Sequence, residues 1–347
     1  MCTIAGYVGE KEAAPILINM MKTLEGLDSG YFTGIATISE GKLYCRKVIG
    51  DLQHLLETTD AASLPGKIGF IHSRTLGNGE GSVEWGHPFV AKKDGVPYLS
   101  HVSNGGAGYF ANRFDDIAAV ANALLKEGYE IPSKEHFEKP KIKVSDGDAV
   151  HVSDVTTQYI MKLMNDGASL LEAEEKALMD IPSDDVDLNI CLDEPTCIAY
   201  AKMSQPMTLG FCPHGAYLAT AALALPDDIR DVILLPSFTA GKVYCDHYTQ
   251  KPFDTLPCTY EKMDNELMLR AYPLILDMLK STKESVGAIR SKLRPLLFPA
   301  DAQSEPTTFV IYETLRAMKK QGILHSEIVT VPGRDGLTAP KTLFWVE

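Results

Sequence analysis

The first ten residues, Met1–Glu10, read MCTIAGYVGE, a thiol followed by a short apolar segment that closes on Gly9. A run of apolar and β-branched residues bounded by glycine is typical of a strand. Removal of Met1 would place a free α-amino group on the same residue as the Cys2 sulfur. Because an α-amine titrates near roughly 7.7–8.0, part of it is neutral at pH 7 and accepts a proton. Cys2 could therefore supply a nucleophile and its base together, if the rest of the chain adds oxyanion donors and a substrate anchor.

Composition indicates a globular protein with an ample core: 347 residues, 45% hydrophobic, with a mean hydropathy of -0.05. No segment approaches the roughly 18 apolar residues of a membrane span and no secretory signal is visible, so we expect a cytoplasmic protein without membrane contact. The seven cysteines lack CxxC spacing, which argues against a disulfide framework and a zinc site. No glycine-rich phosphate-binding motif occurs, and we expect neither a metal nor a cofactor.

Charge divides the chain into two parts. The net charge of -13 argues against broad binding to nucleic acid or anionic lipid. Residues 258–347 hold 12 basic and 11 acidic residues, whereas residues 1–257 hold 21 basic and 35 acidic residues. We therefore place a boundary near Pro252–Pro257 and predict two domains, residues 1–254 and 258–347.

The apolar patterns predict strands, then helices, then strands again in the first part. Strands are expected at 2–10, 32–39, 67–74 and 98–106, and again in short segments between 196 and 248, with helices at 13–27, 114–131, 155–167 and 169–181. The polar residues 133–150 read as a surface insertion. This order favours an α+β protein in which two stacked sheets are covered by helices.

The second part predicts three helices, at 265–282, 283–298 and 306–322, followed by a hairpin that turns at Pro332–Gly336. This is the outline of a winged-helix-like domain. Four basic residues in it could touch DNA phosphates: Arg316, Lys319, Lys320 and Arg334. Because the net charge of this part is small, we favour protein association over DNA binding.

Five short segments occur in the order seen in class II glutamine amidotransferases: MCTIAGYVG, GFIHSRT, WGHPF, HVSNGG and VSDVTTQYI. Over roughly residues 2–254 the chain resembles the glutaminase domain of glucosamine-6-phosphate synthase. The resemblance implies the four-layer αββα sandwich of N-terminal nucleophile hydrolases and hydrolysis of glutamine to glutamate and ammonia. It implies that Cys2 is the nucleophile, with its own α-amine as the base.

The resemblance also implies roles for the other matched residues. Arg74 would hold the α-carboxylate of glutamine, and Asp154 would pair with its α-amino group. The Asn104 side chain and the Gly105 backbone N–H would form the oxyanion hole. His87 would lie in the pocket wall. These residue types suit the roles, since arginine forms a bidentate fork with a carboxylate and glycine admits an oxyanion close to the backbone.

Two positions depart from the family pattern. Gly77 stands near a threonine that usually helps to hold the substrate carboxylate, although Thr75 could partly replace that hydroxyl. Residues 29–34 contain no counterpart of a family arginine. The nucleophile and oxyanion donors are intact, but glutamine and a related small amide both remain open as substrates. A catalytically inactive fold that acts as a regulatory binding protein through its tail is the alternative.

The length of the chain also limits what it can do alone. About 90 residues follow the glutaminase-like part, too few for the sugar isomerase half of glucosamine-6-phosphate synthase. We therefore expect the ammonia acceptor, if there is one, on a separate synthase subunit. Self-association into a homo-oligomer is left open by the sequence.

Overall fold

The computed structural model describes residues 2–75, 81–106, 113–138, 141–181, 183–229, 231–252, 263–300, 302 and 305–347. Strand β1 (Thr3–Gly9) lies in the middle of a seven-stranded antiparallel sheet. The sheet order is β11 (Val232–Leu234), β9 (Thr208–Cys212), β10 (Gly215–Ala219), β1, β4 (Ile68–Arg74), β2 (Phe32–Ser39) and β3 (Lys42–Ile49). Both faces of β1 are covered, which explains why its sequence is apolar without alternation.

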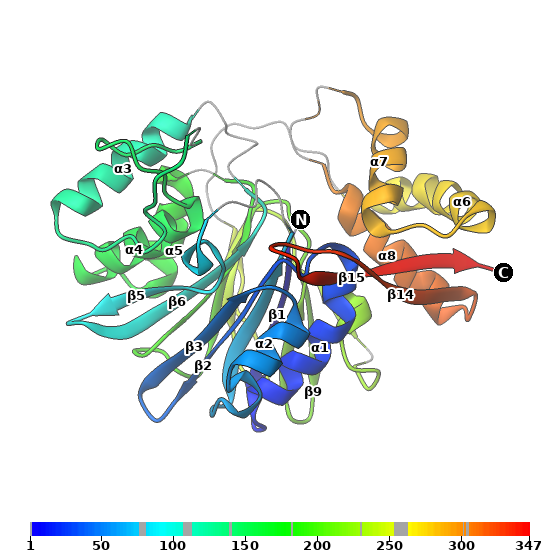
Figure 1. The fold of residues 1–347 in the computed structure, drawn as a ribbon. Helices are drawn as coiled ribbons and strands as arrows, with labels where there is room; N and C mark the ends of the chain where they lie inside the picture. The colour runs from blue at the N-terminus through cyan, green and yellow to red at the C-terminus, as the bar shows by residue number, and fades with distance from the viewer. Residues whose placement is uncertain are drawn as a thin grey trace.

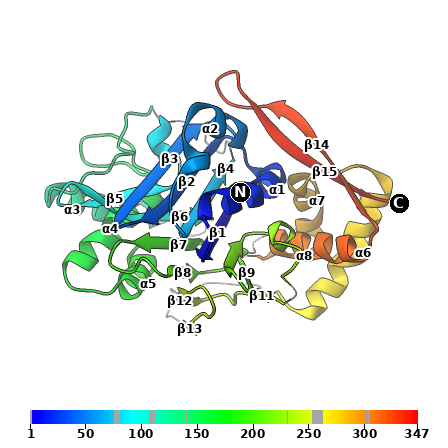
Figure 2. The same cartoon turned by 90° about the horizontal axis from the view of Figure 1, so that it is seen from below.

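A second antiparallel sheet packs on the first (Figures 1 and 2). Its order is β13 (Lys251–Pro252), β12 (Thr239–Val243), β8 (Ile198–Lys202), β7 (Val186–Cys191), β6 (Val96–Asn104) and β5 (Phe89–Lys93). Ile4 and Phe70 of the first sheet meet Leu188 and Ile198 of the second in the core between them. The burial of these side chains from both sides supplies the main driving force for stacking the sheets.

Helices cover the outer face of each sheet. Against the first sheet lie α1 (Ala13–Asp28) and α2 (Leu52–Thr58), and against the second lie α4 (Val152–Asn165) and α5 (Leu170–Asp180). Helix α3 (Phe114–Lys126) packs on α4. The α+β class and the sheet-on-sheet core, predicted from the sequence, are confirmed. The described residues of 133–150 form isolated β-bridges, Glu135 with Ala149 and Lys143 with Ala149, and the surface insertion stays a prediction.

The C-terminal part contains three helices and a hairpin in the predicted order: α6 (Asn265–Ser281), α7 (Val286–Leu297), α8 (Thr307–Lys320), β14 (Leu324–Pro332) and β15 (Thr338–Val346). Figures 1 and 2 place these elements on the side of α1, away from α3, α4 and α5. They share a hydrophobic core with α1. The boundary expected between residues 254 and 258 lies outside the described residues.

Candidate active site

Cys2 directly precedes β1 and lies beside the end of β4. The register pairs Thr3 with Ser73, so the next residue of β4, Arg74, reaches the same end of the sheet. On the other side of β4, Phe32 of β2 is paired with Arg74. The N-terminus is seen at this end of the two sheets in Figure 1. The sheet register thus brings Cys2 and Arg74 together, although 71 residues separate them along the chain.

Asn104 comes to Cys2 from the second sheet. It is the last residue of β6 and is buried, and its Oδ1 accepts a hydrogen bond of 3.0 Å from the Cys2 backbone nitrogen. Because the amide oxygen is used in this contact, the amide NH₂ is the group left to donate to a ligand. The hydrogen bond joins the two sheets at the site.

Gly105 follows in a conformation that requires glycine. Its φ is +145°, and an added Cβ would lie 2.0 Å from the Asp184 backbone oxygen and 2.2 Å from Asp185 Oδ1. A side chain at this position would force the backbone away from Asp184 and Asp185. The structure therefore places Cys2, Asn104 and Gly105 in one cluster.

Arg74 and Thr75 partly offset the effect of burial on the pKa of the Cys2 thiol. Burial raises the pKa of Cys2 above its ordinary value, whereas the positive charge of Arg74 and a hydrogen bond from the Thr75 backbone N–H lower it. Arg74 Nη1 donates to the Trp85 carbonyl oxygen at 2.7 Å, and its Cζ lies 5.0 Å from the centroid of the Phe32 ring. These contacts hold the guanidinium beside the sulfur.

His87 is buried behind the strand that carries Asn104. Its Nε2 lies 3.2 Å from Ser103 Oγ, and its ring centroid is 4.1 Å from that of His72. Burial, and then the positive charge that neighbouring histidines would carry, holds the pKa of His87 well below its usual range. A neutral His87 supports the end of β6 through Ser103.

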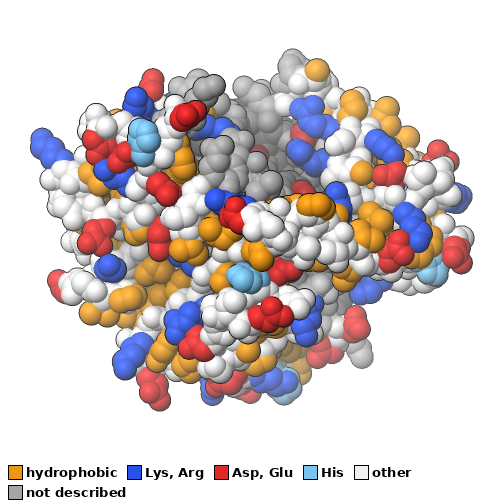
Figure 3. Space-filling model, viewed as in Figure 1, with side chains coloured by type: hydrophobic (Ala, Val, Ile, Leu, Met, Phe, Trp, Pro, Cys, Tyr) orange, Lys and Arg blue, Asp and Glu red, His pale blue; other side chains and the backbone are white. Residues whose placement is uncertain are grey.

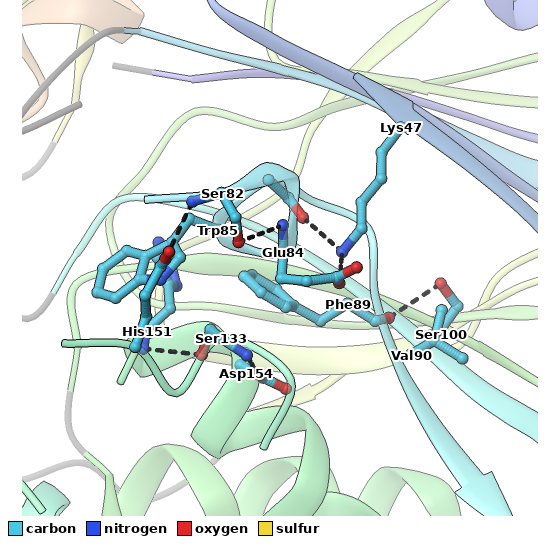
Figure 4. Close-up of polar contacts among 12 residues, drawn as sticks. Lys47, Ser82, Glu84, Trp85, Phe89, Val90, Ser100, Ser133, His151 and Asp154 are labelled. Carbon is cyan, nitrogen blue, oxygen red and sulfur yellow. Dashed lines mark hydrogen bonds and ion pairs between the residues drawn. The ribbon is translucent and has the colours of Figure 1, made fainter. Parts of the chain in front are cut away.

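Asp154 lies in the first turn of α4 and has partners of its own (Figure 4). Oδ2 accepts a 2.7 Å hydrogen bond from the Ser133 backbone nitrogen, and Oδ1 accepts one of 3.1 Å from Gln158 Nε2. Both oxygens are engaged within the helix layer. The structure therefore gives Asp154 a role in anchoring the loop at Ser133, and its pairing with a substrate ammonium stays a prediction.

Asp185 is a candidate that sequence reasoning did not find. It immediately precedes β7, is buried, and has an Oδ1 without a hydrogen-bond partner in the part of the chain that the structure describes. Its charge raises the pKa of the Cys2 thiol. Burial, opposed by a hydrogen bond from Ser183, raises the pKa of Asp185 to about 7. The sequence feature that could have indicated Asp185 is the acidic run in SDDVDLN, residues 183–189.

Gly77, the position where the family pattern departs, lies outside the described residues. Among the residues that the structure describes, no group of three or more histidine, cysteine, aspartate or glutamate residues is arranged to hold a metal ion. The described helices include none that is both long and apolar enough to cross a bilayer.

Two solved structures share this fold. Glutamine phosphoribosylpyrophosphate amidotransferase from B. subtilis superposes with a TM-score of 0.55 and 15% identity, covering 75% of this chain and 50% of that chain. The allosteric regulatory enzyme of purine biosynthesis gives a TM-score of 0.57 and 16% identity over the same shares. The described residues therefore share the fold of these two enzymes.

Two sequence relatives carry the same enzyme name. The glutamine–fructose-6-phosphate aminotransferase of Clostridium tetani is 29% identical over 237 residues, 68% of this chain and 34% of the relative. The enzyme of the same name from Aquifex aeolicus is 25% identical over 314 residues, 87% of this chain and 47% of the relative. The chain spans about a third of the length of the first curated relatives it matches. No protein-family model matches it. The resemblance to class II glutamine amidotransferases, predicted from the motifs, is confirmed.

Proposed function

We propose that the chain, after removal of Met1, hydrolyses the side-chain amide of glutamine to glutamate and ammonia. The observation that carries the proposal is the hydrogen bond of 3.0 Å between the Cys2 nitrogen and Asn104 Oδ1, which puts nucleophile and oxyanion donor side by side. Arg74 and the Thr75 backbone N–H, which favour the thiolate, support it. The relatives at 25–29% identity are named as glutamine-dependent aminotransferases.

In the proposed reaction the Cys2 thiol loses its proton to its own α-amine, and the thiolate attacks the carboxamide carbon. The Asn104 NH₂ and the Gly105 N–H donate to the oxygen that becomes negative in the tetrahedral intermediate. The intermediate collapses with transfer of a proton to the leaving nitrogen, which departs as ammonia. Water then attacks the thioester, releasing glutamate and restoring the thiol. With Met1 attached, the Cys2 nitrogen is an amide and cannot act as the base.

Arg74 is proposed to bind the α-carboxylate of glutamine as a bidentate partner. For the α-amino group, Asp154 was the prediction from the sequence, and Asp185 is the carboxylate that the described geometry favours. Its unpartnered Oδ1 lies against Gly105, next to the proposed oxyanion donors. An ammonium group there would neutralise a buried charge that otherwise costs stability.

The fate of the ammonia and the role of the C-terminal part are also proposals. We propose that a separate synthase subunit accepts the ammonia in the cytoplasm, and that α6–α8 with the hairpin form a winged-helix-like module for protein contact. Positive and negative side chains are interspersed on the face drawn in Figure 3, which favours a protein partner over nucleic acid.

The test is release of glutamate and ammonia by processed protein whose intact mass lacks Met1. We expect Cys2→Ala to abolish release, and Cys245→Ala, a cysteine on another part of the chain, to leave it unchanged. Protein that retains Met1 is expected to be inactive. Equal rates for wild type and Cys2→Ala would refute the proposal.

A second candidate is a regulatory binding protein that retains the pocket without turnover. The raised pKa of the Cys2 thiol, together with a carboxylate against Gly105, favours it, because both oppose formation of negative charge at the site. This candidate predicts that processed protein binds glutamine or glutamate in calorimetry but releases no ammonia.

A further inference from the structure

The loop of the C-terminal hairpin, residues 333–337, reaches the amidotransferase-like part near Cys2. Tyr31 Oη donates to the Pro332 carbonyl oxygen at 3.4 Å, and Arg334 Nη2 donates to the Gly81 carbonyl oxygen at 2.8 Å. The loop is closed by Asp335 and Gly336, both with positive φ. Figures 1 and 2 show the hairpin alongside α1. A segment more than 250 residues from Gly81 therefore contributes to this end of the sheet.

Arg334 and Arg74 share one aromatic ring. The Cζ of Arg334 lies 4.9 Å from the centroid of Phe32, and the Cζ of Arg74 lies 5.0 Å from the same centroid. Both guanidinium groups are thus held beside a ring in β2, next to the strand end where Cys2 is found. Arginine suits this position because its planar cation stacks on aromatic faces.

The hydrogen bonds of Arg334 leave one donor group unused. Nη2 binds Gly81, and Nε lies 3.2 Å from Asp335 Oδ2, whose side chain is 66% exposed. Nη1 is buried and has no partner among the described residues. Within the described part of the chain, Arg74 donates one side-chain hydrogen bond, from Nη1 to the Trp85 carbonyl oxygen. A buried, unpaired guanidinium nitrogen leaves hydrogen-bonding capacity that an oxyanion would satisfy.

Two cations beside one ring repel each other. Burial lowers the pKa of Arg74, and the positive charge of Arg334 lowers it further, although Arg74 carries its own favourable interaction with Cys2. An anion bound by both guanidinium groups would remove this repulsion. A carboxylate has the opposite charge and two acceptor oxygens, so it can accept hydrogen bonds from two guanidinium groups.

We propose that Arg334 binds the carboxylate of the amide substrate together with Arg74, so that the C-terminal hairpin completes the substrate pocket. The proposal rests on the proposed function and deepens it: the preferred substrates are amides with a free carboxylate. The hairpin contacts Tyr31 and Phe32, so Arg334 brings a positive charge to this segment of the first part. Residues 1–254 alone would then lack Arg334, one of the residues that determine substrate specificity.

The experiment compares two substrates and three variants of the full chain. The substrates are glutamine and glutamine whose α-carboxylate is capped as an amide. We expect Arg334→Ala to lower kcat/KM for glutamine by roughly 10- to 100-fold, mainly through KM, and to leave the capped substrate within about threefold, because a charged hydrogen bond is lost only with the carboxylate present. Arg334→Lys is expected to recover part of the loss. Lys341→Ala, at an exposed position in the same hairpin, is the matched control.

Unchanged kinetics with Arg334→Ala would overturn the proposal. Equal losses of kcat/KM on both substrates would also overturn it, because they would assign Arg334 a structural role. Calorimetry of glutamate binding to the Cys2→Ala protein with and without Arg334→Ala separates this result from the proposed function. If the processed wild-type protein shows no turnover, but glutamate binding to the Cys2→Ala protein depends on Arg334, the inference is kept and hydrolysis is rejected. Turnover that does not depend on Arg334 keeps the proposed hydrolysis and rejects the role of Arg334.

Discussion

Charges of opposite sign around the Cys2 sulfur determine how readily it ionises. Burial and the negative charge of Asp185 raise the pKa of the thiol, while Arg74 and the Thr75 backbone N–H lower it. Asp185 itself has a pKa raised to about 7, chiefly by burial. Its carboxylate is therefore mostly protonated below neutral pH and mostly charged above it. Asp185 therefore raises the pKa of the Cys2 thiol only at pH values at which its own carboxylate is charged.

We predict that Asp185→Asn lowers the pKa of Cys2 and speeds its alkylation by iodoacetamide, by up to about the tenfold change that one pKa unit gives. At acidic pH the wild-type carboxyl is neutral and the two proteins should react alike. As the pH rises through about 7 the wild-type group becomes charged and the rates should diverge. The measurement is the rate of modification at Cys2, followed by mass spectrometry of the Cys2 peptide.

The matched control is Asp166→Asn, which changes an exposed carboxylate paired with Lys162 at the end of α4. It should leave the alkylation rate of Cys2 unchanged at every pH. If Asp185→Asn and the wild type also react at the same rate throughout, Asp185 does not act on the nucleophile.

At the scale of elements, helix α1 and strand β15 meet at Gly26. A Cβ at this position would lie 2.2 Å from Thr342 Oγ1 and 3.2 Å from the Thr342 nitrogen. Within a helix, glycine is less favourable than alanine by roughly 0.5–1 kcal/mol. The close approach of the hairpin explains why a glycine occupies the helix here. The hairpin that packs against Gly26 is also the one that carries Arg334 in its loop.

We predict that Gly26→Ala destabilises the protein by about 1–3 kcal/mol, the usual cost of overpacking, in spite of the better helix propensity of alanine. Thr342→Ala removes the atom that would clash and should suppress most of this loss. Urea unfolding of the two single variants and the double variant gives the coupling free energy. Stabilisation by Gly26→Ala alone would contradict the packing described here.

Local periodicity predicted elements whose side chains follow one simple pattern, such as α1, β1 and β2. It missed β7, where Leu188 faces the core between the sheets while Asp187 and Asn189 point outward and are still buried. Asn189 donates to Glu174 of α5 at 2.9 Å, so the helix layer, which is distant in sequence, makes the burial of this polar group tolerable. A single sequence does not reveal such a partner, and polar positions are read as exposed.

The same limit applies to the candidate site. The order of the sequence motifs predicts that Cys2 and Asn104 belong to one active site. A hydrogen bond joins them in the structure, and their catalytic roles stay predictions. Asp185 and Arg334 were not assigned to the pocket, because they approach it through tertiary packing. The sequence makes Arg334 a candidate for DNA contact. In the structure its side chain donates to the Gly81 carbonyl oxygen and lies beside the Phe32 ring.

At the scale of the whole molecule, the two parts that differ in charge share one hydrophobic core. Leu17 and Leu24 of α1 belong to the same buried cluster as Ile275 of α6, Ile289 of α7 and Leu315 of α8. Removing residues 263–347 would expose the apolar outer face of α1. We therefore expect the two parts to unfold together, because each contributes to burying the other.

The two tryptophans provide a test, since Trp85 lies beside Arg74 and Trp345 lies in the hairpin. In Trp85→Phe and Trp345→Phe proteins, each with one remaining tryptophan excited selectively at its red edge, the urea midpoints should coincide. Adding Ile275→Ala, which truncates a fully buried side chain of α6, should shift both midpoints equally and cost about 2–5 kcal/mol. Leu269→Ala changes a side chain of α6 that is 76% exposed, and should alter neither midpoint by more than about 0.5 kcal/mol. If Ile275→Ala moves the Trp345 transition and leaves the Trp85 transition in place, the shared core does not couple the parts, and the hairpin cannot be a fixed wall of the pocket.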